Sequence, residues 1–318
     1  MKWNRLSSGF LGFFCIFVSS AAVAYDQPFV NLGFTSFLDG GPPAGPGLYF
    51  QNYLAYYTTH RFNDNKGDRL PFPQTDLHAT ADILQLIYLS KIKILGASLG
   101  ISAVEPVVLN ARVNDGLPIA KLKSTTGFGD LTIGPALQFD PVMRKNGKGP
   151  FYVQRFELDV IAPIGHYDSN FAIMPSSNFW SINPYWANTL WITEKWAIST
   201  RTHYLWNAKN KSPNVSFGPK VRSTQAGQAI FANIATDYAI TEKFHLGVNS
   251  YVFYQISKTR VDEIAVPARE EKVWAIGPGM LYSLTKNQFL FFNLYFEKGA
   301  RNRTQGTSGV LRYALHFG

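Results

Sequence analysis

The chain has 318 residues, a formal net charge of +9 at pH 7 and a single cysteine, and 46% of its residues are hydrophobic. The positive charge is scattered without a basic run, which argues against nucleic-acid binding, and one cysteine cannot form an intramolecular disulfide. After residue 24 no apolar stretch is long enough for a membrane-spanning helix, so a chain that crosses a membrane would have to cross with strands.

Residues 1–24 have the pattern of a secretory signal peptide. Lys2 and Arg5 precede an apolar run at 10–18, and Ala22-Val23-Ala24 forms a small-x-small cleavage site. An uncleaved anchor helix is the alternative, but the run is shorter than the ~20 residues that span a bilayer. We therefore expect export, cleavage after Ala24 and one mature domain at 25–318.

The first part of that domain, residues 25–47, is too rich in glycine and proline near its end to be a spanning strand. Two interpretations stay open. The segment could fold into a barrel as a small plug or constriction, or it could be a flexible periplasmic leader.

The remainder alternates polar and apolar residues and predicts twelve strands, most of them near the ~9–11 residues that a tilted strand needs to cross the outer membrane. The predicted strands are 48–60, 83–89, 94–104, 130–140, 151–161, 179–192, 196–207, 229–240, 244–257, 273–284, 289–298 and 309–317. The fold class is therefore all-β: a transmembrane antiparallel β-barrel. An even number of strands puts both termini on one rim.

The connections alternate between short and long, as in outer-membrane barrels. The phrase Ile-Thr-Glu-Lys followed by an aromatic residue occurs at 192–196 and 240–244, with a looser copy at 284–289, and each copy predicts a tight hairpin turn. Further short periplasmic turns are predicted at 90–93 and 141–150. The long extracellular loops are predicted at 61–82, 105–129, 163–178, 208–228, 258–272 and 299–308.

Within the strands, one phase is apolar and the other contains the charges. A membrane barrel turns the apolar phase to lipid and the mixed phase to the lumen, whereas a soluble barrel does the opposite. With the lumenal assignment, the predicted substrate path consists of Tyr49, Tyr53, Arg155, Glu157, Asp159, Arg201, His203, Phe231, Asn233, Asp237, Asn249, Tyr251, Phe253, Asn293, Tyr295 and Glu297. An aromatic girdle at the membrane interfaces is predicted from Trp186, Trp191, Trp196, Trp206, Tyr251, Tyr254, Tyr282 and Tyr295.

Four phrases occur in the order found in a known family. They are residues 42–49, the Gly-Phe-Gly-Asp-Leu-Thr-Ile-Gly-Pro run at 127–135, the Pro-Ile-Gly-His-Tyr-Asp run at 163–168, and Gly277-Pro278-Gly279. Together they resemble the meta-pathway phenol-degradation family of bacterial outer-membrane barrels. The resemblance implies an outer-membrane location and passive uptake of small hydrophobic compounds, chiefly aromatic ones, linked to their degradation. It implies no catalytic site and no cofactor.

The last residues also resemble a barrel-assembly signal, because Leu311, Tyr313, Leu315 and Phe317 alternate along one face, although Phe317 is penultimate. We accordingly expect four kinds of partner: the barrel-assembly machinery, outer-membrane lipid, lipopolysaccharide and small hydrophobic solutes.

Other functions have weaker patterns. A structural or partner-binding barrel without transport is one alternative. A lipid hydrolase is another, since His166 and Ser169 lie close in sequence, but a base and a nucleophile need an oxyanion hole beside them. A metal site lacks ligand spacing in the lumenal group formed by His203, His245, His316 and Asp237. We therefore expect no enzyme activity, no metal and no nucleic-acid partner.

Overall fold

The computed structural model describes residues 26–42, 44–117 and 122–317. The expected signal peptide and its cleavage site lie outside these residues. Among the residues described, no helix is long and apolar enough to cross a membrane.

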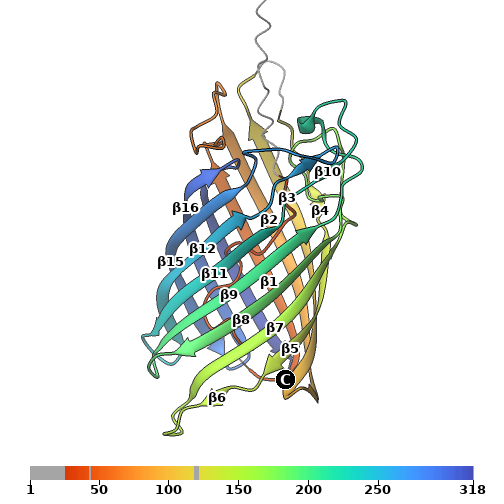
Figure 1. The fold of residues 1–318 in the computed structure, drawn as a ribbon. Helices are drawn as coiled ribbons and strands as arrows, with labels where there is room; N and C mark the ends of the chain where they lie inside the picture. Colours follow the sequence, from red (N-terminus) through yellow and green to blue (C-terminus); the bar gives the residue numbers. More distant parts are fainter. Residues whose placement is uncertain (1–25, 43, 118–121, 318) are drawn as a thin grey trace, which may run out of the picture.

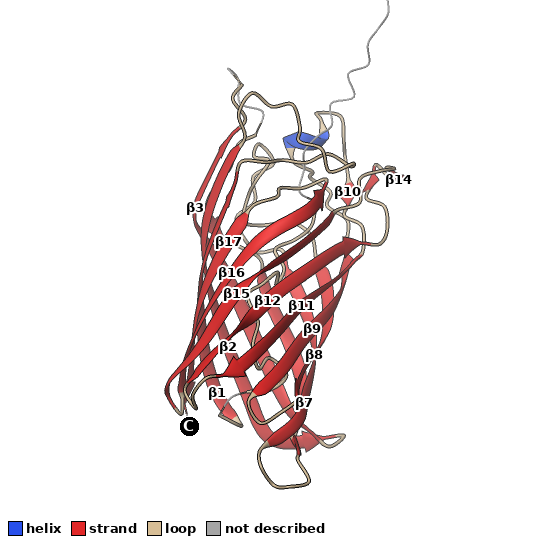
Figure 2. Cartoon of the chain, turned by 90° about the vertical axis from the view of Figure 1, so that its left-hand side faces the viewer, coloured by secondary structure: helices blue, strands red, loops and turns tan. Residues whose placement is uncertain are grey.

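Twelve antiparallel strands form a closed barrel, so the predicted fold class is confirmed (Figures 1 and 2). The first strand pairs with the last, from Leu48 opposite Phe317 to Thr58 opposite Thr307, and this pairing completes the closure. The barrel strands are β1 (Gly47–Thr59), β2 (Asp76–Ile94), β3 (Ala97–Asn114), β5 (Leu131–Phe139), β7 (Pro150–Ala162), β8 (Ser181–Trp191), β9 (Trp196–Asn207), β11 (Ala229–Ala239), β12 (Phe244–Gln255), β15 (Lys272–Thr285), β16 (Gln288–Arg301) and β17 (Thr307–Phe317).

Short elements decorate the two rims. The two-residue strands β4 (Gly127–Phe128) and β6 (Val142–Met143) extend the wall beside β3 and β7. Above the barrel, β10 (Thr224–Gln225), β13 (Arg260–Val261) and β14 (Ile264–Ala265) form a separate small sheet, and Val215–Phe217 form a 3₁₀ turn. We call the rim with the long connections the outer rim and the opposite one the inner rim.

The repeated phrase forms inner-rim hairpins as predicted. The Thr193 hydroxyl accepts hydrogen bonds from the backbone N–H groups of Lys195 and Trp196 at 3.2 and 3.0 Å. Thr241 repeats this arrangement with the N–H groups of residues 243 and 244. A threonine side chain thus closes each turn locally, which explains why the same phrase recurs between different strands.

The predicted turn at 90–93 is wrong. β2 continues to Ile94, and the hairpin turns at Leu95 and Gly96, which have φ values of 55° and 78°. Two successive positive φ angles suit a two-residue hairpin, whereas residues 90–93 stay extended around a bulge between Leu89 and Lys93. Both strands of this hairpin are longer than predicted, at 19 and 18 residues, mainly because β2 begins at Asp76 and β3 runs to Asn114, inside the loops predicted at 61–82 and 105–129.

The barrel has an apolar exterior and a mixed interior. In β16, Phe289, Phe291, Asn293, Tyr295 and Glu297 are all buried, and the alternate residues face outward. The girdle prediction is wrong for three of its members. Tyr251 and Tyr295 share the inward phase and are 3% and 0% exposed, and Trp191 lies on the inward phase of β8, opposite the buried Ala197. Outward-facing members of the girdle are Trp186, Trp196, Trp206, Tyr254 and Tyr282.

The described chain begins inside the barrel. Residues 26–42 and 44–46 run through the lumen from the outer rim, where Asp26 contacts Arg269, to the inner rim, where the Pro46 carbonyl lies 3.0 Å from His316 Nε2. Figure 1 shows this segment in red within the strands and the C-terminus at the inner rim. The expectation that both termini share one rim is therefore wrong for the described chain: Asp26 lies at the outer rim because the segment crosses the lumen before β1.

Candidate functional site

Hydrogen bonds and ion pairs attach the lumenal segment, residues 26–42 and 44–46, to the wall along its length, and three of these attachments lie at different levels. Further bonds join Gln27 to the Gly227 carbonyl, Leu38 to Ser199 and Gly40 to Thr189. At the outer rim, the Asp26 carboxylate accepts two hydrogen bonds from Arg269, at 2.8 and 2.9 Å, and its backbone N–H donates to Glu271 at 3.1 Å. Burial raises the pKa of Glu271 to about 7, although the Arg303 cation opposes this shift. The outer attachment therefore contains a carboxyl group that titrates near neutral pH.

The middle attachment uses an amide. Asn233 on β11 accepts a hydrogen bond from the Gly33 N–H at 2.9 Å and donates to the Asn31 carbonyl at 3.0 Å. An amide side chain can both accept and donate, so it replaces a strand partner for the irregular backbone of the segment.

The third attachment is a buried ion pair. Arg201 on β9 donates two hydrogen bonds to the Asp39 carboxylate, at 2.6 and 2.7 Å, and the two side chains are only 11% and 7% exposed. The Arg201 guanidinium also lies 4.3 Å from the centre of the Tyr185 ring. Charge-assisted, two-pronged contacts of this kind fix both position and orientation.

Glycines allow the segment to approach the wall closely. Gly33 has a φ of +82°, and a Cβ there would lie 2.7 Å from the Tyr295 ring. Phe37 is completely buried, and a Cβ at Gly247 or Gly279 would lie 2.8 Å from its ring. The wall therefore has a recess that accommodates Phe37, and the lumen is filled at this level.

Above this level lies a cavity of about 350 Å³. This volume falls within the range of roughly 300–1,000 Å³ for small-molecule sites and exceeds the roughly 150 Å³ of an apolar cavity that binds benzene. Its lining is mainly apolar and comes from the lumenal segment, the first three strands and the outer loops: Phe29, Val30, Leu32, Phe34, Ala55, Phe62, Leu77, Ala79, Ala81, Leu122, Ala172, Ile173 and Phe179.

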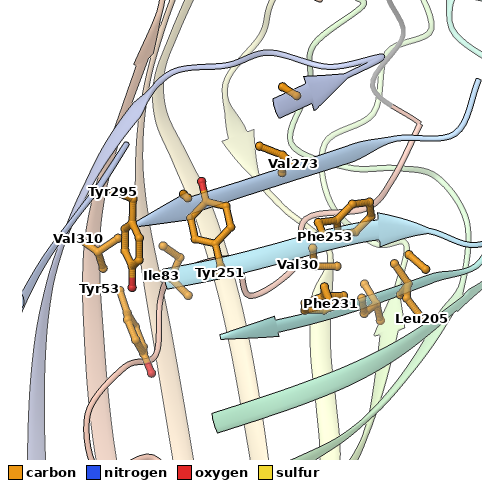
Figure 3. Close-up of a cluster of buried hydrophobic side chains, with 14 residues drawn as sticks. Val30, Tyr53, Ile83, Leu205, Phe231, Tyr251, Phe253, Val273, Tyr295 and Val310 are labelled. Carbon is orange, nitrogen blue, oxygen red and sulfur yellow. The ribbon is translucent and has the colours of Figure 1, made fainter. Parts of the chain in front are cut away.

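An apolar cluster borders this cavity. Val30 of the lumenal segment lies among inward-facing side chains that include Phe231, Tyr251 and Phe253 (Figure 3). The His203 imidazole stacks on Phe231 with the ring centres 4.2 Å apart. The segment thus contributes to the apolar surface that borders the cavity.

One carboxylate faces the same region. Glu297 accepts hydrogen bonds from the hydroxyls of Tyr57 and Tyr251, both at 2.8 Å, and from the Gly306 N–H at 2.7 Å. The Tyr57 hydroxyl also lies 2.7 Å from Thr304 Oγ1. These donors hold the charge in place within a largely apolar setting.

A second cavity, of about 70 Å³, lies deeper in the lumen and is more polar than the first, because Glu157, Asp159, Arg201 and His203 line it beside apolar residues. Glu157 is paired with Arg155 and accepts hydrogen bonds from Ser102 and from the Tyr185 hydroxyl. Water-sized polar spaces between charged groups are usually hydrated. The lumen therefore changes from a wide apolar chamber to a narrow one of mixed character.

All sixteen residues predicted for the substrate path lie on the inward phase, but only some border a cavity. Tyr251 and Glu297 line the apolar cavity. Tyr53, Glu157, Asp159, Arg201 and His203 line the polar one.

The other predicted residues have different surroundings. Phe231, Phe253 and Tyr295 belong to the apolar cluster, Arg155 pairs with Glu157, and Asn233 holds the lumenal segment. The remaining four lie elsewhere in the lumen: Tyr49 donates to the Gly45 carbonyl, Asp237 contacts His245, Asn249 donates to the Leu294 carbonyl, and Asn293 is fully buried.

Sequence reasoning missed most of the cavity lining. The alanines at 55, 79 and 81 and the residues of the outer loops carry no chemical signature. The apolar group Phe29, Val30, Leu32 and Phe34 was a usable signal, because it is unusual in a solvated leader.

Neither alternative chemistry is assembled in the residues described. In the described residues, the His166 side chain makes no hydrogen bond to Ser169, and the His166 backbone N–H donates to the Phe128 carbonyl at 2.8 Å. Within the same part of the chain, no group of three or more His, Cys, Asp or Glu residues is placed to hold a metal ion.

Comparison with known proteins now adds to this geometry. A family model described as "Putative MetA-pathway of phenol degradation" matches residues 59–313. The chain belongs to this family. A search of curated proteins gave no match.

Among solved structures, this family member is similar to the COG4313 outer membrane channel from Pseudomonas putida F1, with a TM-score of 0.75, 17% identity, and coverage of 91% of this chain and 100% of that one. This likeness establishes a shared outer-membrane barrel fold. The toluene transporter TbuX from Ralstonia pickettii is a more remote match, with a TM-score of 0.41, 10% identity, and coverage of 87% and 92%.

Proposed function

We propose that this protein is an outer-membrane channel for passive uptake of small hydrophobic compounds, chiefly those with a single aromatic ring. The apolar cavity of about 350 Å³ in the outer half of the lumen carries the proposal. It is large enough for such a solute, and the outer loops form part of its lining. Membership of a family named for phenol degradation is consistent with this solute class.

The apolar cavity is the first binding site on the proposed path. Transfer of an apolar solute from water into such a site is favourable by about 25 cal/mol of free energy per Å² of buried apolar surface. Lipopolysaccharide makes the outer leaflet a poor solvent for them, so a protein path past that leaflet speeds uptake without an energy source.

The lumenal segment is the second element of the path. Phe37 fills the lumen below the apolar cavity, and the polar cavity of about 70 Å³ is too small to pass a ring compound. We infer that residues 26–46 act as a plug that shifts when solute passes. Its attachments suit this role, because they are hydrogen bonds and ion pairs that can be released without unfolding a strand.

The test is solute uptake by cells with an intact outer membrane. Initial rates for labelled toluene and phenol, supplied at low concentration, are compared between cells with wild-type protein and cells with the empty vector. Ala81→Trp fills part of the apolar cavity, whereas Ala265→Trp places the same side chain on the exposed β14.

We expect wild type and Ala265→Trp to raise uptake equally, and Ala81→Trp to reduce it several-fold. Heat-modifiable mobility on gels shows whether each variant forms a barrel. Equal uptake with and without folded protein refutes a channel for these solutes. Equal uptake by the two tryptophan variants refutes a path through this cavity.

A further inference from the structure

Positive charge is concentrated on one side of the outer rim. The β9–β11 connection, residues 208–228, contains four basic and no acidic residues: Lys209, Lys211, Lys220 and Arg222. The β1–β2 connection, in contrast, sets the acidic Asp64 and Asp68 against Arg61, Lys66 and Arg69. The β12–β15 connection adds Lys258 and Arg260 to the first group, and it also contains Arg269 and four acidic residues: Asp262, Glu263, Glu270 and Glu271.

The small outer sheet holds these two connections together. Gln225 of β10 is the register partner of Arg260 in β13, and Asn210 pairs with Thr224. One oxygen of Asp262 accepts the backbone N–H groups of Arg222 and Ser223 at 2.9 and 2.8 Å. The cationic positions are therefore held on a folded support, which lowers the entropic cost of binding a ligand.

Most of these cations lack an acidic partner. Lys209 pairs with Glu263, but no ion pair joins the other five to a carboxylate within the described part of the chain. The five are exposed, and we call them the outer basic patch: Lys211, Lys220, Arg222, Lys258 and Arg260.

The outer basic patch lies just above the lipid-facing wall. Trp206 and Tyr254, at the outer ends of β9 and β12, are 36% and 42% exposed on the outward phase. The Lys272 ammonium lies 4.9 Å from the centre of the Tyr254 ring. Next to the patch, Ile264 on β14 is 72% exposed, and Figure 2 shows β14 at the upper edge of the molecule, beside the barrel wall.

We propose that the outer basic patch binds the phosphate groups of lipopolysaccharide in the outer leaflet. Lysine and arginine bind phosphate through charge-assisted hydrogen bonds, and basic clusters beside a membrane attract anionic lipids. The exposed Ile264 and the aromatic residues below would contact the acyl chains of the same lipid. This surface is separate from the proposed path for solutes, so either proposal can fail without the other.

The test compares two sets of five glutamines. The patch variant carries K211Q, K220Q, R222Q, K258Q and R260Q. The control variant changes five exposed lysines on inner-rim connections: K145Q, K148Q, K195Q, K243Q and K286Q. Both lose the same formal charge. Gel mobility after heating verifies that each forms a barrel.

Binding to purified protein in detergent is measured by native mass spectrometry with three probes: bisphosphorylated lipid A, dephosphorylated lipid A and inorganic phosphate. We expect wild type and the control to bind bisphosphorylated lipid A at least about tenfold more tightly than the dephosphorylated form, and the patch variant to lose this difference. The difference should shrink as salt is raised.

Three results would overturn the proposal. They are equal binding of bisphosphorylated lipid A by the two variants, equal binding of the two lipids by wild type, and binding of inorganic phosphate as tight as that of lipid A. The last result would indicate a site for the free anion instead of the lipid.

Discussion

Asp39→Asn should release the lumenal segment and raise the conductance of the channel. The substitution removes the charge that faces Arg201, in a pair whose two hydrogen bonds measure 2.6 and 2.7 Å. With side-chain exposures of 11% and 7%, water cannot fully replace the lost partner. Breaking a buried pair from one side costs about 3–5 kcal/mol.

We take the lower end, about 3 kcal/mol, because the Tyr185 ring still faces the Arg201 guanidinium. At 1.4 kcal/mol for each factor of ten, the equilibrium constant for release of the segment rises about 100-fold. Adding Arg201→Met to Asp39→Asn should reverse part of this rise in the release constant, because no unpaired charge then remains buried.

Single-channel recording in planar bilayers measures this equilibrium as the open fraction. Asp140→Asn is the control, since its pair with Lys93 is 65% and 49% exposed and should contribute less than about 1 kcal/mol. A variant that lacks residues 26–41 gives the conductance of a fully open barrel for comparison. If the deletion conducts but Asp39→Asn remains as closed as wild type, the ion pair does not hold the segment and the reasoning is refuted.

Three further predictions concern the outer attachment, the segment and the wall. The pKa of Glu271 is raised from 4.5 to about 7, so its contribution to holding the segment in place is fully present below about pH 4.5 and is lost as the pH rises towards 7. The open fraction of the wild-type channel should therefore rise over that range. Glu271→Gln should remove the rise. Gly33→Ala should raise the open fraction about tenfold, because it adds about 1–2 kcal/mol of backbone strain and a clash with Tyr295. The control is Gly147→Ala, where φ is +73° but the space around the residue is open. This variant should leave the open fraction unchanged. Ile234→Arg on the lipid face should lower the free energy of unfolding into urea from vesicles by about 2–4 kcal/mol, and Ile240→Arg at the inner turn by about 0–1; equal effects would contradict the assigned depth of β11.

The wall of this barrel was largely predictable, because its determinants are local. An inward residue and its outward neighbour are adjacent in sequence, so alternation in β11 and β16 identifies both faces. The Thr193 and Thr241 turns close through hydrogen bonds that span two or three residues. In the β2–β3 hairpin the local signal is ambiguous, and the polar run at 90–93 predicts the turn at the wrong place. The chain reverses at Leu95 and Gly96, where φ is positive.

The contents of the lumen depend on contacts that no local pattern encodes. Asp39 meets Arg201 across 162 positions of sequence, and Asp26 meets Arg269 across 243. Segment 26–46 has no strand period, so composition alone could not distinguish a plug from a leader. The apolar cavity is bordered by ordinary alanines and loop residues, which become a binding surface only when barrel closure brings β1, β2, β3 and the outer loops around Phe29 to Phe34. Sequence alone thus determined the wall, its two faces and most of its turns, because those depend on neighbours, while the tertiary structure decided what fills the lumen, because that depends on distant residues meeting across it.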